Sequence, residues 1–226
     1  MFFWDSLEKQ QMVTPKAALA GRAAPVLDSP APHTVLGSDI LAEPRSDQEV
    51  IYLASGCFWG AEKAAWELGA DSTAVGYMGG FIPNPTYKEV CTGKTGHTET
   101  VRVLYTPTQL PTERLLQAFF ESHDPTSLNR QGGDIGTQYR SAIFPTTPQQ
   151  EELARRMIDA YQEVLENNGF GKIVTEVTPA SEVGPFYPAE DYHQQYLDKN
   201  PNGYQCHART GMACPLPGAG PVATGK

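Results

Sequence analysis

Cys57 is the residue of this chain best placed to do chemistry. It follows an apolar run at residues 50–54 that is typical of a buried strand, and it precedes residues 61–68, which are mostly helix formers. A thiol at such a strand-to-helix turn faces unpaired backbone N–H groups and the positive end of the helix dipole, which favour the nucleophilic thiolate. Because free cysteines are more often simply buried, this local context supports a nucleophile and a structural cysteine about equally.

Glu99 is the second residue in an unusual position. It belongs to residues 98–105, which alternate with the period of a β-strand, and it lies on the apolar face of that strand. Such a carboxylate either ends the buried face, paired with Arg102 or with solvent, or occupies a pocket. In a pocket, loss of hydration raises the pKa of a carboxyl group, which then holds its proton near neutral pH.

Three further polar side chains lie in loops that could serve a site. Tyr87 follows a proline-containing turn, and Asp134 and Tyr139 lie in a long polar loop at residues 123–140. Taken singly, the tyrosines could fill gaps in a core and Asp134 could be a turn residue. A loop this long within a compact domain is nevertheless often functional.

Four motifs connect these residues. They are Gly-Cys-Phe-Trp-Gly at residues 56–60, Asn-Pro-Thr-Tyr at 84–87, Gly-His-Thr-Glu at 96–99 and Gly-Thr-Gln-Tyr-Arg-Ser at 136–141. Weaker matches follow at 185–187, 189–196 and 199–201. Over residues 50–204 the chain resembles the peptide methionine sulfoxide reductases of the A type.

This resemblance implies a role for each residue. Cys57 is implied to be the nucleophile, and Glu99 the acid that protonates or hydrogen-bonds the sulfoxide oxygen. The other implied site residues are Tyr87 and Tyr139 as hydroxyl donors, Phe58 and Trp59 as the cradle of the substrate methyl group, and Asp134 as support for the site or the sulfur. These roles suit a sulfoxide, which needs an apolar wall for its methyl group, converging donors and an acid for its departing oxygen.

Recycling of the enzyme would need a second thiol. The product on Cys57 is a sulfenic acid, which another thiol condenses to a disulfide. Cys206 and Cys214 lie in a tail rich in glycine and proline, a composition that predicts flexibility. The resemblance implies that Cys206 resolves the sulfenic acid, and that Cys214 then takes over the disulfide for reduction by thioredoxin. Gln205 interrupts the usual pattern of the family, which leaves this order open, while Cys91 matches no catalytic position and is expected to be a bystander.

Other functions explain fewer residues. A zinc site built from Cys206, His207 and His193 is disfavoured by the ligand spacing, and no metal or other cofactor is expected. A thioredoxin-like oxidoreductase would need a Cys-x-x-Cys motif, which is absent. A redox sensor that is not an enzyme would need only the cysteines, and would leave Glu99 and the two tyrosines without a role.

The elements that must hold these residues predict an α+β fold. Strands are expected at residues 50–54, 72–77, 98–105, 141–144 and 173–177, and helices at 61–68, 111–122 and 148–167. Their order predicts a two-layer sandwich, in which helices pack on a mixed β-sheet with a ferredoxin-like core. Residues 1–48, which contain five prolines, are expected to form an extended arm, 49–178 the catalytic domain and 179–226 a coil-rich tail with the recycling cysteines.

The composition limits the partners. The chain of 226 residues has 17 Lys and Arg against 26 Asp and Glu, and its net charge of −9 argues against nucleic acid or an anionic membrane. No apolar run is long enough to span a bilayer, and residues 1–5 lack the features of a signal peptide, so a cytoplasmic protein is expected. We expect a monomer that is reduced by thioredoxin and acts on oxidised proteins and on free methionine sulfoxide.

Overall fold

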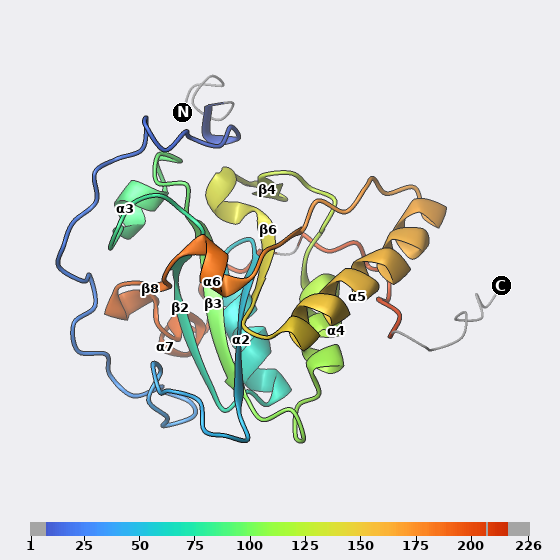
Figure 1. Ribbon diagram of the computed structural model, residues 1–226, viewed down its shortest axis with the longest axis horizontal. Helices are drawn as coiled ribbons and strands as arrows, with labels where there is room; N and C mark the ends of the chain where they lie inside the picture. The colour runs from blue at the N-terminus through green and yellow to red at the C-terminus, as the bar shows by residue number, and fades with distance from the viewer. Residues whose placement is uncertain (1–7, 207, 217–226) are drawn as a thin grey trace.

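A six-stranded β-sheet forms the centre of the molecule, with strand order β7-β6-β1-β3-β2-β8 (Figure 1). The structure is a computed structural model that describes residues 8–206 and 208–216. The strands are β1 Glu49–Ser55, β2 Ser72–Met78, β3 Thr98–Tyr105, β6 Ser141–Pro145, β7 Glu176–Val177 and β8 Tyr187–Pro188. Neighbouring strands are antiparallel except β6 and β7, which are parallel, so the sheet is mixed.

Three long helices pack together with the sheet in the main core. They are α2 Phe58–Leu68, α4 Thr112–Ser122 and α5 Pro148–Asn167. Buried side chains of α4 and α5, such as Phe120 and Met157, share one cluster with Ile51 and Val103 of the sheet. Each such side chain contributes about 1.5–3 kcal/mol of transfer free energy on burial. The predicted α+β class, with helices on a mixed sheet, is therefore confirmed.

Short elements join the long ones near the loops. They are α3 Tyr87–Val90, the hairpin of β4 Arg130–Gln131 and β5 Asp134–Ile135, a 3₁₀ turn at Thr137–Tyr139, α6 Ala180–Val183, a 3₁₀ turn at Asp191–His193 and α7 Tyr196–Lys199. In the central strands, β3 lies between β1 and β2, and both of these run antiparallel to it. The finer ferredoxin-like description of this core stays a prediction.

Two predictions for the second half of the chain were wrong. Of the expected strand at 173–177, only Glu176–Val177 pairs with β6, because the earlier backbone groups bond elsewhere: the N–H of Ile173 donates to the Gln162 side chain at 2.7 Å, and that of Val174 to a carbonyl at 2.8 Å. The residues after Pro179 are also more than a tail, since β8 forms an edge of the sheet beside β2. A Cβ at Gly76 would lie 2.4 Å from the backbone of β8, so glycine permits this close approach.

The N-terminal arm lies against the domain over much of its length. Figure 1 shows it in blue, passing from the region of α3 along one side of the molecule. The N–H of Leu19 donates to the carbonyl of Lys94 at 3.0 Å, and the Arg102 side chain donates to carbonyls at residues 40 and 42. The division into segments 1–48, 49–178 and 179–226 stays a prediction. In the part of the chain that the structure describes, no helix combines the length and apolarity needed to cross a membrane.

Candidate active site

Cys57 lies at the turn from β1 into α2, as the sequence predicts. It is the residue that precedes the first turn of α2, and Phe58 and Trp59 are the first two helical residues. The turn depends on Gly56, whose φ of 92° favours glycine. A Cβ on Gly56 would also lie 2.7 Å from the side chain of Gln131, so glycine lets the β4–β5 hairpin approach the thiol.

The electrostatics of the Cys57 thiol differ from the expectation. Burial raises its pKa well above the usual range, the charge of Glu99 adds to this shift, and the backbone N–H of Trp59 acts in the opposite direction. The prediction that the helix N-terminus favours a thiolate was therefore wrong for the resting site. Loss of hydration outweighs the helix terminus, so the thiol is protonated before a substrate is bound.

The sequence left two positions open for Glu99, at the exposed end of its strand or enclosed in a pocket, and the structure shows it enclosed. Its side chain is buried, and its Oε2 accepts a hydrogen bond from the N–H of Phe58 at 3.0 Å. Arg102 does not pair with it, because that guanidinium donates to backbone carbonyls of the arm. Burial raises the pKa of Glu99 to about 8, as the sequence led us to expect, so at neutral pH the group holds its proton beside Cys57.

Tyr87 and Tyr139 approach the same carboxyl group from two loops. Tyr87 begins α3, and its N–H donates to Glu190 at 2.9 Å; Tyr139 ends the first 3₁₀ turn. Burial raises the pKa of both hydroxyl groups well above the usual range, and the charge of Glu99 contributes to both shifts. Both tyrosines are therefore protonated donors within electrostatic reach of Glu99.

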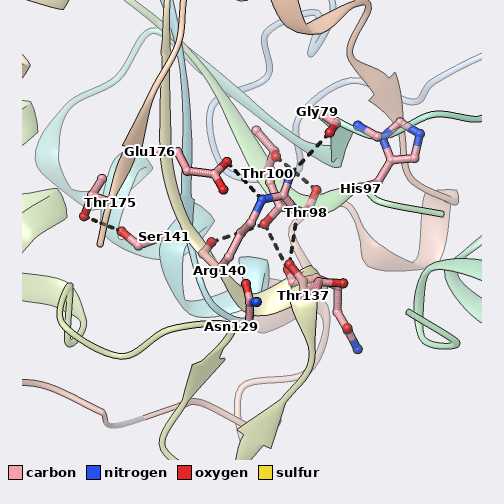
Figure 2. Close-up of polar contacts among 12 residues, drawn as sticks. Gly79, His97, Thr98, Thr100, Asn129, Thr137, Arg140, Ser141, Thr175 and Glu176 are labelled. Atoms are coloured by element: carbon pink, nitrogen blue, oxygen red, sulfur yellow. Dashed lines mark hydrogen bonds and ion pairs between the residues drawn. The ribbon is translucent and has the colours of Figure 1, made fainter. Parts of the chain in front are cut away.

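Arg140 holds the turn that carries Tyr139. Its buried guanidinium donates to Glu176 at 3.1 Å and to the carbonyl of Thr137 at 3.0 Å, as Figure 2 shows. The hydroxyl of Thr98, on the strand that carries the buried carboxyl group, donates to the carbonyl of Arg140 at 3.2 Å. The phenol and the carboxyl group are thus fixed to one hydrogen-bonded frame.

An aromatic wall of Phe58, Trp59, His193 and Tyr196 stands beside the thiol. The indole N–H of Trp59 donates to Nδ1 of His193 at 3.1 Å, and its ring stacks on Tyr196 with centroids 3.8 Å apart. Burial lowers the pKa of His193 to about 4, so the ring is neutral and can accept this bond. Sequence reasoning named His193 only as a possible zinc ligand and missed Tyr196, although two tyrosines and a histidine within residues 189–196 were a usable signal.

Asp134 and Cys206 also lie within electrostatic reach of Cys57. Asp134, on β5, accepts a hydrogen bond from the Tyr204 hydroxyl at 3.0 Å. The sulfur of Cys206 lies 3.6 Å from the carbonyl oxygen of Gln131. Cys57 and Cys206 line one small cavity of about 50 Å³, so the structure brings the nucleophile candidate and one tail cysteine together.

Cys214, by contrast, is held apart in the main core. It is 1% exposed, and burial raises the pKa of its thiol to about 12. Its N–H donates to Glu121 at 2.9 Å, and its carbonyl accepts from Gln117 at 2.7 Å. The hydroxyl of Tyr161 donates to the carbonyl of Met212 at 2.9 Å. The prediction of a flexible tail, made from its glycines and prolines, is therefore wrong for residues 208–216, because side chains of α4 and α5 bind this segment.

The remaining predictions concern Cys91 and zinc. Cys91 follows α3, and its sulfur is hydrogen-bonded to the hydroxyl of Tyr87. All four cysteines are unpaired thiols. Among the described residues, no three His, Cys, Asp or Glu side chains are grouped as metal ligands would be, and His207 of the zinc alternative lies outside those residues.

The fold and the site define the class of protein first: this is a thiol-dependent oxidoreductase, in which a cysteine faces a protonated acid and has a second thiol as a neighbour. Sequence comparison then gives the family. The family described as peptide methionine sulfoxide reductase matches residues 49–214, and the chain belongs to it. The resemblance carried by the four motifs, and the enzyme class that it implied, are confirmed.

Individual relatives agree along most of their length. The chain is 50% identical over 208 residues to peptide methionine sulfoxide reductase MsrA of Corynebacterium efficiens, covering 90% of this chain and 94% of the relative. The chain is 52% identical over 210 residues to peptide methionine sulfoxide reductase MsrA of Vibrio cholerae, covering 92% of this chain and 97% of the relative. Among solved structures, methionine sulfoxide reductase A of Corynebacterium diphtheriae is similar with a TM-score of 0.82 at 48% identity, covering 92% of this chain and 99% of that one. Reduced Mxr1 of Saccharomyces cerevisiae is similar with a TM-score of 0.67 at 36% identity, covering 74% of this chain and 94% of that one.

Proposed function

We propose that this protein reduces methionine sulfoxide, free or in oxidised proteins, to methionine, and that it acts on the S epimer at sulfur. The observation that carries the proposal is the pairing of Cys57 with a carboxyl group that is buried and protonated. A sulfoxide oxygen is a poor leaving group, and an acid placed beside the attacking sulfur supplies the proton it needs. Phe58 and Trp59 offer an apolar surface to the substrate methyl group.

The chemistry divides among the residues as follows. The sulfur of Cys57 attacks the sulfoxide sulfur and gives up its thiol proton, while Glu99 delivers a proton to the oxygen. Tyr87 and Tyr139 donate hydrogen bonds to that oxygen as it gains negative charge. The S–O bond of the substrate then breaks, its hydroxyl passes to the Cys57 sulfur, and the bond between the two sulfurs is cleaved. Methionine leaves with its sulfur reduced by two electrons, Cys57 is oxidised to a sulfenic acid, and the carboxylate of Glu99 takes up the thiol proton. Asp134 supports the site from β5.

Recovery of the thiol would proceed through the tail. The Cys206 thiol attacks the Cys57 sulfenic acid, releases water and forms a disulfide, a step supported by the cavity that the two cysteines share. Cys214 then attacks this disulfide once its segment has left the core, and thioredoxin reduces the product. A thioredoxin-dependent cycle with four free thiols suits a reducing compartment, so we place the protein in the cytoplasm.

A single-turnover experiment tests this function. One equivalent of methionine sulfoxide, added without reductant, should yield close to one equivalent of methionine and the loss of two free thiols per methionine, because one disulfide forms. Cys57→Ser should yield none, while Cys91→Ser, which changes another half-buried cysteine, should behave as the wild type. Methionine formed at the wild-type rate by Cys57→Ser would reject Cys57 as the nucleophile.

A further inference from the structure

The aromatic wall depends on a segment that is distant in the sequence. Both contacts that fix the Trp59 ring come from residues 193–196, since His193 accepts its indole N–H and Tyr196 stacks on its face. Between these two residues lies Gln195, with φ 46° and ψ 43°. A residue with a Cβ adopts this left-handed conformation only when its surroundings hold it there.

Glu62 supplies those surroundings. It lies in α2, nearly one turn after Trp59, and it is fully buried. Its carboxylate accepts the backbone N–H of Gln195 at 2.8 Å, the side-chain amide of Gln195 at 2.8 Å and the hydroxyl of Thr73 at 3.1 Å. One buried carboxylate therefore ties the helix that carries Trp59 to the segment that packs on its ring.

The N-terminal arm completes this network through His33. Nδ1 of His33 accepts the N–H groups of Val35 and Leu36 at 3.2 and 3.1 Å, so the ring proton is on Nε2. Nε2 then donates to the Thr73 hydroxyl at 2.9 Å, and that hydroxyl donates to Glu62. The ring is 1% exposed, and burial lowers its pKa to about 4, which keeps it neutral. The hydrogen bonds run in one direction from the arm to the buried carboxylate.

Thr34 gives the arm a second hold on the same segment. Its N–H faces the side-chain oxygen of Gln195 at 3.4 Å, and its hydroxyl donates to Asp198 at 2.6 Å. The amide of Gln195 is thus shared, with its nitrogen bonded to Glu62 and its oxygen to the arm. The arm, α2 and residues 195–198 form one closed set of contacts behind the aromatic wall.

We propose that His33 and Glu62 are positioning residues for the aromatic wall, and that the arm thereby sets how tightly the enzyme binds the methyl group of a sulfoxide substrate. Neither side chain touches the substrate; both act through Gln195 on the orientation of Trp59. This inference rests on the proposed function, because it assigns substrate binding to that wall.

Steady-state kinetics of the full chain test the proposal, with methionine sulfoxide as substrate and dithiothreitol as reductant. In His33→Ala, loss of the hydrogen bond to Thr73, with the two that hold the ring to its own loop, should raise KM about fivefold or more and change kcat by less than about twofold, because the methyl contact is made equally in the ground and transition states. His33→Gln keeps an amide N–H that can reach Thr73 and should restore most of the affinity. Glu62→Gln replaces one acceptor oxygen with an amide donor where three donors need acceptors, and should raise KM further.

Ser38→Ala is the matched control. Ser38 lies on the same arm, and its hydroxyl donates to Ser72 of β2 at 2.8 Å rather than to α2 or residues 195–198; its carbonyl accepts from the N–H of His33, a backbone bond that alanine keeps. It should lower the melting temperature slightly and leave KM unchanged. The proposal is overturned if His33→Ala and Glu62→Gln, folded and active, keep the wild-type KM and lose only thermal stability. Absence of turnover in the wild-type protein would instead contradict the proposed function itself.

Discussion

In the proposed mechanism, Glu99 is the side chain on which the reactivity of the site depends most directly. A carboxyl group with a pKa of about 8 is a proton donor at the pH of a cell, whereas an exposed glutamate is not. The hydrogen bond from Phe58 favours the charged form, but burial outweighs it. The site therefore combines a protonated acid and a protonated thiol: in the proposed mechanism the arriving S–O group takes the proton of Glu99, and the carboxylate then takes the proton of the thiol.

Replacement of this acid gives the first prediction. Glu99→Gln should slow the reductase step by about 10²–10⁴-fold, the usual contribution of a positioned acid. Tyr87→Phe and Tyr139→Phe should each cost less, because the other hydroxyl remains. In wild type the single-turnover rate should fall as the pH rises through about 8, where Glu99 loses its proton, and Glu99→Gln should lack this fall. A Gln variant with the wild-type rate, beside inactive tyrosine variants, would show that the acid is misassigned.

The same substitution should also stabilise the protein. Because burial raises the pKa of Glu99 from 4.5 to about 8, an unfolded chain releases this proton more readily than the folded one. The stabilisation linked to the protonated form is complete below pH 4.5 and is lost as the pH rises towards about 8. Glutamine does not ionise, so Glu99→Gln should raise the melting temperature at pH 7 by about 3–6 °C. Thermal unfolding measured at pH 5 should show a much smaller gain; a gain independent of pH would rule out this explanation.

At the scale of elements, the segment at residues 208–216 decides when Cys214 can react. It has no regular secondary structure, and side chains of α4 and α5 hold its backbone. Tyr161→Phe removes the hydroxyl that bonds to Met212 and Thr210. In the reduced protein, labelling of Cys214 by a thiol reagent should then become about fivefold faster, the effect of roughly one hydrogen bond.

A second buried tyrosine provides the control for this measurement. Tyr105 also donates through its hydroxyl, to Glu49 of β1, but its hydrogen-bond partners are Glu49, Thr112 and Gln150, all outside residues 208–216. Tyr105→Phe should leave the labelling rate of Cys214 near that of wild type. Equal acceleration in both variants would indicate general loosening of the core, and no acceleration in Tyr161→Phe would mean that the hydroxyl does not hold the segment.

The sequence predicts elements well where a single local pattern decides them. The alternation in β3 and the apolar stripes of α4 and α5 indicated these elements, and the pattern around Cys57 indicated its turn. The sequence predicts less where contacts between residues distant in the chain decide the local structure. The backbone N–H of Ile173 bonds to a side chain of α5 instead of to a strand. Cys214 is buried, although it lies in a segment whose composition suggests mobility. The pKa of the Cys57 thiol is a further example, because the burial that raises it depends on residues that are distant in the sequence.

At the scale of the whole molecule, the proposed relay requires a thiol in the core, Cys214, to reach a disulfide in the site. Cys206→Ser and Cys214→Ser should each spare the first turnover, because Glu99 and the aromatic wall remain. Both should stop repeated turnover with thioredoxin. If Cys206 resolves first, peptide mapping of oxidised Cys214→Ser should find a Cys57–Cys206 disulfide, as their shared cavity suggests. A dominant Cys57–Cys214 bridge in wild type after one turnover would reverse the order, and a bridge to Cys91 would exclude the tail relay.

The position of Tyr196 and His193 on the Trp59 ring has a consequence for synthesis on the ribosome. A growing chain that has emerged only as far as β7 already contains Cys57, Glu99, Tyr87 and Tyr139, but it still lacks one side of the wall and the edge strand β8. Affinity for substrate should therefore appear late in translation, when residues 187–196 leave the exit tunnel. Until then, the nascent protein carries its reactive sulfur without the surface that selects what reaches it.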